Sequence, residues 1–361
     1  MLFKKFLSKP RDRQSSHPAG TAFPGVVHVS SAELVQYRLT ARDLALGSRL
    51  PARSIITGGH ASRFRGRGMD YLESRGYQPG DDIRNMDWRV TARSGRAHVK
   101  LYQEERERPV VVMLDLGPGM FFATRGAFKS VIAARAAALI GWAAVQNGDR
   151  IGALLFNGGH HELRPASGQR GVLRLIRQLV SATDPVPGNA DRSSNHGGHL
   201  NDALARLHRV ARPGSLVFIL SDFYAIDDDT RRHLQRLRQH CDVVACQIVD
   251  ALETEPLLPG RYAVSDGQQH GVLDTRTAAR RRACSDYFSS HHHAVARLMQ
   301  QSAVPLQRIR TTDDVAQSLR AALAGATSAA VQLLSLIHIS EPTRPMKESR
   351  MAAGAGKRGG G

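Results

Sequence analysis

In the second part of this chain, short apolar runs alternate with amphipathic segments, and this alternation limits the fold more than any other feature. Runs of the length of a buried strand stand at residues 110–114, 151–156, 216–220 and 243–249. Segments with apolar residues at helical spacing lie at residues 128–146, 171–180, 200–211 and 230–240. Strands that are apolar throughout and joined by helices form a parallel sheet with both faces covered. We therefore expect an α/β domain of this type.

Weaker elements follow the apolar runs. They are strand-like pieces at 261–264 and 271–273, a long helix at 276–301, a last strand at 304–309 and a capped helix that starts at Thr311. The long helix contains three consecutive histidines, His291 to His293. Successive helical positions point about 100 degrees apart, so neighbouring side chains do not converge on one metal ion. We expect a solvated helical surface at this triplet.

Two acids follow the apolar runs directly. Asp115 comes immediately after residues 110–114, and Asp222 comes two positions after residues 216–220. In parallel sheets, ligands bind at the carboxyl ends of the strands. Both carboxylates should therefore lie on the same rim of the sheet, where they could meet at one site.

The segment from Gly76 to Arg96 concentrates three acids, four arginines and a tryptophan. Residues 78–81, Gln-Pro-Gly-Asp, predict a turn, because Pro presets one backbone angle and Gly accepts the left-handed one. We expect a framework of bidentate ion pairs, with Trp88 packed beneath it, that braces this region against the α/β domain. The residues of this framework are Asp81, Arg84, Asp87 and Arg93. The alternative is a site that binds phosphate through Arg84, Arg89, Arg93 and Arg96. The local acids would compete with the phosphate for these guanidiniums.

The composition of the chain limits the classes of function that it can have. The 361 residues carry 50 Lys and Arg against 32 Asp and Glu, a formal charge of +18 that favours acidic partners. Most of the arginine is scattered through helical segments, which is typical of solvated faces, so nucleic-acid binding is not the preferred interpretation. The three cysteines form no CxxC pair, which indicates a reducing compartment. No apolar run approaches the ~18 residues of a membrane helix, so we expect a cytoplasmic protein, with peripheral contact to the inner membrane as an alternative.

These observations divide the chain into parts. Residues 1–25 are expected to form a basic flexible tail, residues 26–108 a small β-rich motif region, and residues 109–325 the α/β domain. From Leu334 to Arg344 the sequence resembles translated sequencing-adapter DNA, and no hydrophobic periodicity follows it. We therefore expect residues 334–361 to be non-native or disordered.

With these elements in place, the chain resembles the bacterial family called domain of unknown function 58. The motif that carries the resemblance consists of Tyr77, Pro79, Gly80, Asp81, Arg84, Asp87, Trp88, Ala92 and Arg93. It is followed in the expected order by Asp115, Phe128-Lys129 and Gly148-Asp149-Arg150. The resemblance implies a core similar to a von Willebrand factor type A domain, which is a Rossmann-like parallel sheet with helices on both faces.

The resemblance also bears on metal binding. Type A domains often bind a divalent cation through an Asp-x-Ser-x-Ser loop, a Thr on a second loop and a later Asp. Here the hydroxyl positions are Gly117, Gly119 and Gly198, and only Asp115 and Asp222 remain. A hard cation needs an oxygen-rich shell. We therefore expect a degenerate site that serves as an interaction surface and no required cofactor, with weak Mg²⁺ binding as the alternative.

No Gly-x-Ser-x-Gly elbow, Walker loop or His-Glu-x-x-His motif occurs, so we expect no enzyme activity. Members of the family resembled are commonly encoded beside MoxR-type AAA+ ATPases. The resemblance thus implies an adaptor that works with such an ATPase in protein assembly or chaperoning, with other type A-domain proteins as further partners. Two alternatives stay open: a protein that binds nucleic acid or an anionic surface, and a metal-dependent hydrolase that uses Asp115 and Asp222.

Overall fold

The structure is a computed structural model. It describes residues 7–8, 25–44, 46, 69–104, 108–157, 159–184, 196–265 and 270–323. The expected adapter-derived segment, most of the expected basic tail and the glycine-rich stretch before Met69 lie outside these residues.

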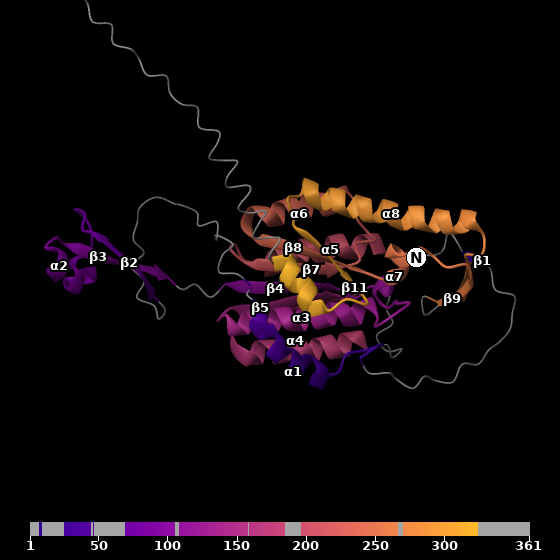
Figure 1. The fold of residues 1–361 in the computed structure, drawn as a ribbon, viewed down its shortest axis with the longest axis horizontal. Coiled ribbons are helices and arrows are strands. Elements are labelled where there is room, and N and C mark those ends of the chain that lie inside the picture. Colours follow the sequence, from indigo (N-terminus) through magenta and orange to yellow (C-terminus); the bar gives the residue numbers. More distant parts are fainter. Residues whose placement is uncertain are drawn as a thin grey trace, which may run out of the picture.

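A six-stranded sheet forms the centre of the α/β body (Figure 1). Its strands are β4 (Pro109–Asp115), β5 (Arg150–Phe156), β6 (His160–Ala166), β7 (Leu216–Ser221), β8 (Asp242–Val249) and β11 (Leu306–Arg310). Their spatial order is β11-β8-β7-β4-β5-β6, and every neighbouring pair is parallel except β5 and β6. The apolar runs that we identified occupy the four central strands, where both faces are buried. This confirms the predicted α/β fold of von Willebrand factor type A-like architecture.

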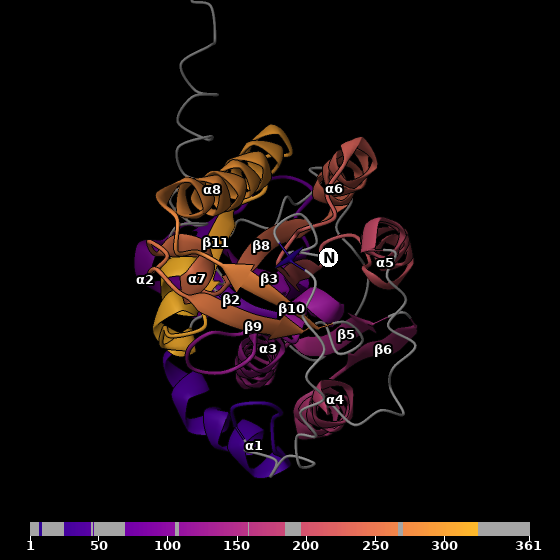
Figure 2. The same cartoon turned by 90° about the vertical axis from the view of Figure 1, so that its right-hand side faces the viewer.

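Helices cover both faces of the sheet (Figure 2). On one face lie α1 (Ser31–Thr40), α3 (Lys129–Gln146) and α4 (Gly168–Thr183). On the other lie α5 (His196–Val210), α6 (Asp228–His240) and α8 (Ala278–Gln301). Because side chains alternate along a strand, each strand contributes to two cores: Val110, Val112 and Leu114 pack on the α3 side, and Val111 and Met113 on the α5 side.

Smaller elements lie around this body. They are the three-stranded sheet of β1 (Leu7–Ser8), β9 (Arg261–Ser265) and β10 (His270–Asp274), the short helix α7 (Ala251–Thr254), and the 3₁₀ turns η1 (Ala41–Asp43) and η3 (Pro118–Met120). The last described helix covers residues 315–323. Asp314 caps it by accepting hydrogen bonds from the backbone N–H groups of Ala316 and Gln317.

A separate unit precedes the body and contains the arginine-rich motif (Figure 1). It consists of the antiparallel hairpin of β2 (Met69–Gly76) and β3 (His98–Glu104), with the turn η2 (Ile83–Asn85) and helix α2 (Trp88–Ser94) between the strands. The expected β-rich character is present, but the boundary differs. Helix α1 packs on α3, and the indole N–H of Trp142 donates to the Leu34 carbonyl oxygen at 3.0 Å. The first part of the region 26–108 therefore lies with the α/β body.

Three local predictions were wrong or incomplete. Neither strand β2 nor helix α2 was expected. Strand β6 was also missed, because as the antiparallel edge strand it is polar, with the sequence His-His-Glu-Leu-Arg-Pro-Ala. An edge strand with an exposed side does not need the apolar run by which the central strands were recognised.

Candidate functional site

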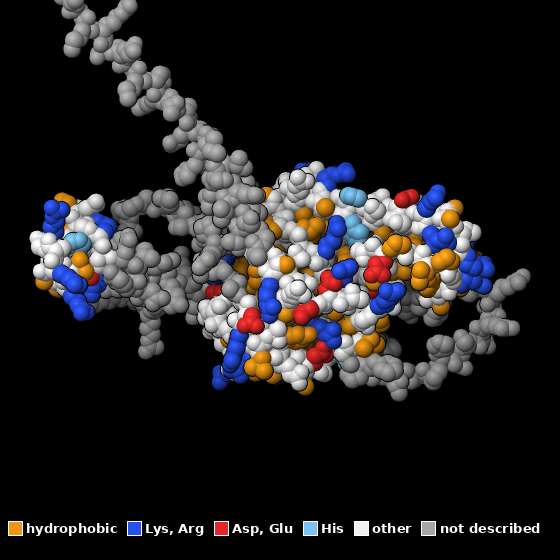
Figure 3. All heavy atoms as spheres, viewed as in Figure 1, with side chains coloured by type: hydrophobic (Ala, Val, Ile, Leu, Met, Phe, Trp, Pro, Cys, Tyr) orange, Lys and Arg blue, Asp and Glu red, His pale blue; other side chains and the backbone are white. Residues whose placement is uncertain are grey.

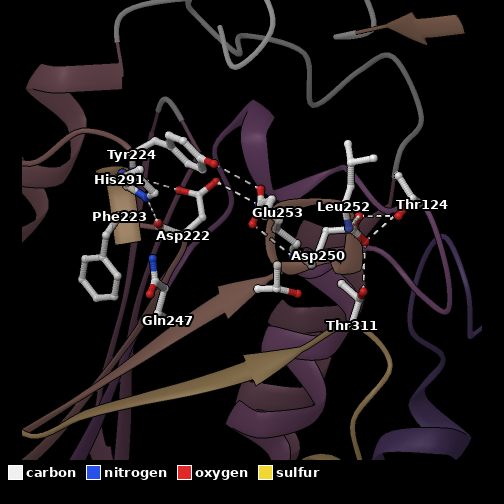
Figure 4. A network of polar contacts seen from close by, with 12 residues as sticks. Thr124, Asp222, Phe223, Tyr224, Gln247, Asp250, Leu252, Glu253, His291 and Thr311 are labelled. Carbon is white, nitrogen blue, oxygen red and sulfur yellow. Dashed lines mark hydrogen bonds and ion pairs between the residues drawn. The ribbon is translucent and has the colours of Figure 1, made fainter. Parts of the chain in front are cut away.

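Strands β4, β7 and β8 end at the same edge of the sheet, and a carboxylate stands at the end of each; Figure 4 shows those of Asp222 and Asp250. These are Asp115 at the end of β4, Asp222 directly after β7, and Asp250 directly after β8. The first two were predicted to share a rim, and they are close enough for the Asp222 charge to raise the pKa of Asp115. We call the residues that follow these three strands the carboxyl rim.

Asp115 is held by two hydrogen bonds. The Gly117 backbone N–H donates to its Oδ1 at 2.8 Å, and the Ser221 hydroxyl donates to its Oδ2 at 2.6 Å. Ser221 in turn accepts from the Phe223 backbone N–H at 2.9 Å, at a residue whose φ of +58° is rare outside glycine. Burial, followed by the charge of Asp222, raises the pKa of Asp115 to about 7. The carboxyl group therefore titrates near neutral pH in the folded protein.

Asp115→Asn is expected to change how stability depends on pH. A carboxyl with a raised folded-state pKa binds its proton more tightly in the folded state. Its contribution to stability is therefore present at low pH and lost between about pH 4 and about pH 7. After a discount for partial exposure, the difference in free energy of unfolding between variant and wild type should shift by about 1–2 kcal/mol in favour of the variant from pH 4.5 to pH 8. Urea titrations at pH 4.5 and pH 8 measure this, and equal pH slopes for both proteins would refute the assignment.

A lysine supplies the cation of the carboxyl rim. Lys129, the first residue of α3, is fully buried, and its Nζ lies 2.5 Å from Oε1 of Glu253 and 3.9 Å from Oδ2 of Asp222. Burial alone would lower the pKa of this ammonium, but Glu253 and then Asp222 outweigh it and raise the pKa. Lys129 therefore stays charged at neutral pH, between two carboxylates.

Two aromatic rings cover this ion cluster. The Tyr224 hydroxyl donates to Glu253 Oε1 at 3.3 Å, and Lys129 Nζ stands 5.4 Å from the centre of the Tyr224 ring. The His291 ring stacks on Tyr224 at 3.9 Å, and its Nε2 bonds the Asp222 carbonyl oxygen at 3.1 Å. Burial raises the pKa of the Tyr224 phenol and lowers that of His291, so both remain neutral. The rings exclude water from the ion pair below them.

The histidine triplet is therefore not a solvated surface. His292 is buried, with its Nδ1 3.2 Å from Gln247 Nε2 and its Nε2 3.3 Å from the Glu253 carbonyl oxygen. Burial lowers the pKa of His292 to about 4, so the ring is neutral. Only His293 is exposed. The three rings do point in different directions, as helical geometry requires.

Asp250 forms a second cluster on the same rim (Figure 4). It is fully buried, and four donors converge on its carboxylate. They are the Thr124 backbone N–H, the Thr124 hydroxyl, the Leu252 backbone N–H and the Thr311 hydroxyl, at 2.5 to 3.0 Å. This carboxylate thus ties the loop before α3 to the ends of β8 and β11.

The residues of the carboxyl rim do not fit a divalent cation of the type A kind. A Cβ at Gly117 would stand 3.1 Å from Oδ1 of Asp115, so a serine there would crowd that carboxylate. Gly198 lies in the first turn of α5 and offers no oxygen ligand from a side chain. Within the described residues, no three His, Cys, Asp or Glu side chains converge in a metal-binding arrangement. Asp222 already faces the ammonium of Lys129.

The family motif lies in the separate unit and not on the rim. Tyr77 donates its backbone N–H to the Ala97 carbonyl oxygen at 2.9 Å. The expected turn is present, with Gly80 after Pro79 at a φ of +108° and the Asp81 N–H bonded to the Gln78 carbonyl oxygen at 3.0 Å. A hydrogen bond from the Gln78 backbone N–H, then Arg75, lowers the pKa of Asp81.

The motif acids do not pair with the arginines that we expected. Asp81 pairs with Arg75, at 2.8 Å. Asp87 accepts from the Ser74 hydroxyl at 2.7 Å and caps α2 through the Val90 N–H, and the Ser74 bond is the main reason its pKa is low. These bonds stay inside the unit, so they do not brace it against the α/β body.

The remaining motif residues also differ from expectation. Trp88 is 66% exposed and is not packed beneath the arginines. Within the described part of the chain, neither Arg84 nor Arg93 has a carboxylate within 4.0 Å. Asp81 and Asp87 bond instead to Arg75 and Ser74 of strand β2 and to backbone N–H groups.

Sequence reasoning missed Lys129, Glu253 and Asp250 as rim residues. Asp250 could have been found, since it follows a buried apolar strand as Asp115 does. Lys129 also carried a signal, because it opens a long Ala-rich segment that contains just one other basic residue, Arg135. Glu253 had none, because its position against Lys129 depends on where β8 and α3 meet in space.

Comparisons with known proteins show what this chain is similar to. An uncharacterized protein of Mycobacterium tuberculosis strain H37Rv is 29% identical over 316 residues, which is 84% of this chain and 98% of that protein. Among solved structures, the conserved hypothetical protein BatB of Bacteroides thetaiotaomicron is 10% identical, with a TM-score of 0.38 over 61% of this chain and 99% of that one. A von Willebrand factor type A protein of Catenulispora acidiphila is 11% identical, with a TM-score of 0.32 over 65% and 45% of the two chains.

None of the helices in the described part of the chain is both long enough and apolar enough to cross a lipid bilayer.

The model of one family, described as protein of unknown function DUF58, matches residues 73–294. This range includes the arginine-rich motif, the central sheet except β11, and the carboxyl rim, and it extends over more than half of the chain. The chain therefore belongs to the DUF58 family.

Proposed function

We propose that this protein is a non-enzymatic interaction module that recognises a protein partner through its carboxyl rim, without a metal ion. The observation that carries the proposal is Lys129, a fully buried ammonium 2.5 Å from Glu253 and 3.9 Å from Asp222. In a type A domain, a bound cation organises the equivalent loops. Here a covalently attached cation does so, which makes the rim permanently organised and independent of metal supply.

The partner that we propose is a MoxR-type AAA+ ATPase, with a role in protein assembly or chaperoning in the cytoplasm. Support comes from membership of the DUF58 family, whose members are commonly encoded beside such ATPases. The outer surface of the rim offers contact groups for this partner. Arg125 and Glu255 form an exposed ion pair at 3.3 Å, beside an apolar cleft of about 380 Å³ lined in part by Phe122, Leu257 and Tyr262.

Co-purification with a MoxR-type AAA+ ATPase tests the proposal. The tagged chain, treated with EDTA and then desalted, is expected to retain the nucleotide-loaded ATPase as well as a chain supplied with Mg²⁺ does. Arg125→Glu should weaken retention about tenfold, because it reverses a charge at the rim. The control is Arg282→Glu on α8, which makes the same charge change at another exposed site. Failure of the wild type to retain the ATPase would exclude this partner, and loss of retention after chelation would exclude the metal-free rim.

A further inference from the structure

The motif unit exposes large apolar side chains that the fold does not use. Eight large hydrophobic residues of the described chain are exposed, and three of them lie within this small unit: Tyr77 at 36%, Ile83 at 61% and Trp88 at 66%. Tryptophan and tyrosine are enriched among the residues that dominate protein interfaces. The unit therefore exposes residue types that are typical of an interface.

Arginines surround these apolar side chains. Between residues 83 and 100 the chain carries four arginines and Lys100 against one acid, Asp87. Arg84, Arg89, Arg93 and Arg96 are all exposed, and none has a carboxylate of the described residues within 4.0 Å. Figure 3 shows Lys and Arg side chains at several edges of this unit.

The acids that were expected to neutralise these arginines are committed elsewhere. Asp81 is bonded to Arg75 and to the Gln78 N–H, and Asp82 accepts from the Arg84 backbone N–H at 3.0 Å. Asp87 is buried and bonded to Ser74 and Val90. The guanidiniums are consequently available to a ligand.

The local backbone places two of the arginines on one side of α2. Arg89 and Arg93 are one helical turn apart on α2 and therefore project from the same side. Trp88 is next to Arg89 at the start of the helix, and the left-handed Gly95, at φ +68°, turns the chain so that Arg96 follows directly. Arginine forms bidentate bonds with carboxylates and stacks on aromatic rings, so this combination suits an anionic partner that also has apolar side chains.

We propose that this surface, formed by Tyr77, Ile83, Trp88 and the four arginines, binds an acidic protein segment that carries aliphatic or aromatic side chains. Carboxylates of the segment pair with the guanidiniums, and its apolar side chains cover Ile83 and Trp88. Ile83 has no function in binding a phosphate backbone but can be covered by an apolar side chain, so an acidic peptide with such side chains fits better than a nucleic acid. The surface is separate from the carboxyl rim and does not depend on the proposed ATPase.

Fluorescence anisotropy with the full chain and a labelled peptide of alternating Glu and Leu tests the proposal. Arg89→Glu/Arg93→Glu is expected to weaken binding at least about tenfold, and Trp88→Ala at least about fivefold. Arg89→Lys/Arg93→Lys keeps the charge but loses the planar fork, so it should give an intermediate loss. The matched control is Arg282→Glu/Arg297→Glu on α8, which reverses two exposed charges and should remain close to the wild type.

Tryptophan fluorescence gives a second readout. Trp88 and Trp142 are the two tryptophans of the chain, and Trp142 is 3% exposed, so acrylamide quenching reports mainly on Trp88. The peptide should protect Trp88 from acrylamide in the wild type and less so in Arg89→Glu/Arg93→Glu, and circular dichroism verifies that each variant is folded. The proposal is overturned if the α2 and α8 variants lose affinity equally, or if a Glu-Ser peptide binds as tightly as the Glu-Leu peptide. Tighter binding of a DNA duplex that displaces the peptide would make this a nucleic-acid surface instead.

Discussion

Lys129→Met is expected to lower the free energy of unfolding by about 3–5 kcal/mol at pH 7, the largest effect of any single change at the carboxyl rim. Methionine has a similar length and packs in the same space, so the loss is electrostatic. It leaves Glu253, which is buried, and Asp222 without the ammonium that faces both. Chemical denaturation followed by circular dichroism measures the change.

The pH dependence and a double variant separate this mechanism from simple misfolding. Burial already raises the pKa of Glu253, and loss of Lys129 raises it further. A carboxyl with a raised folded-state pKa destabilises the protein as pH rises through that value, so Lys129→Met should recover stability when the pH is lowered towards 5. Lys129→Met/Glu253→Gln, which removes both charges, should be more stable at pH 7 than the single variant. If the double variant is equally unstable, the ion pair is not the cause.

Asp250→Asn is expected to cost about 2–3 kcal/mol although it changes the side-chain volume very little. Both carboxylate oxygens of Asp250 accept two hydrogen bonds each, from Thr124, Leu252 and Thr311. An amide has one acceptor oxygen, so its NH₂ group must face two donors in a buried site whichever way it is turned. Thermal and urea unfolding of the variant measure the cost.

Thr311→Val provides the matched control for Asp250→Asn. It removes one of the four donors and leaves the carboxylate bonded to the other three, so it should cost about 1 kcal/mol. If Asp250→Asn lowers the free energy of unfolding no more than Thr311→Val does, the carboxylate does not hold this part of the rim together. The two variants together therefore measure how far the loop before α3 depends on Asp250.

The elements predicted correctly are those whose signal is local. The strands β4, β5, β7 and β8 are continuous apolar runs, and α3 is a long Ala-rich segment. Their composition alone therefore indicates that they are buried on both sides. Strand β6 and the hairpin strand β2 were missed, because a strand with one exposed side has a mixed composition that also suits a loop.

The motif at residues 76–96 illustrates a different limit. Its turn at Pro79 and Gly80 was predicted, because turn formation depends on adjacent residues. Its ion pairs were not, because the spacing of Asp81, Arg84, Asp87 and Arg93 shows which charges are near each other but not which donors are nearer still. Ser74 and Arg75 on β2, a strand that was not expected, take the acids and leave the arginines at the surface.

The sequence by itself determined the α/β class, the DUF58 resemblance and the presence of Asp115 and Asp222 on one rim, because all three depend on order and spacing along the chain. Only the tertiary structure decided which cation lies beside the negative charges of the rim. Lys129 and Glu253 are 124 positions apart, and they meet because α3 and the end of β8 pack against each other. An ion pair between distant residues depends on backbone packing in three dimensions, which no local pattern encodes.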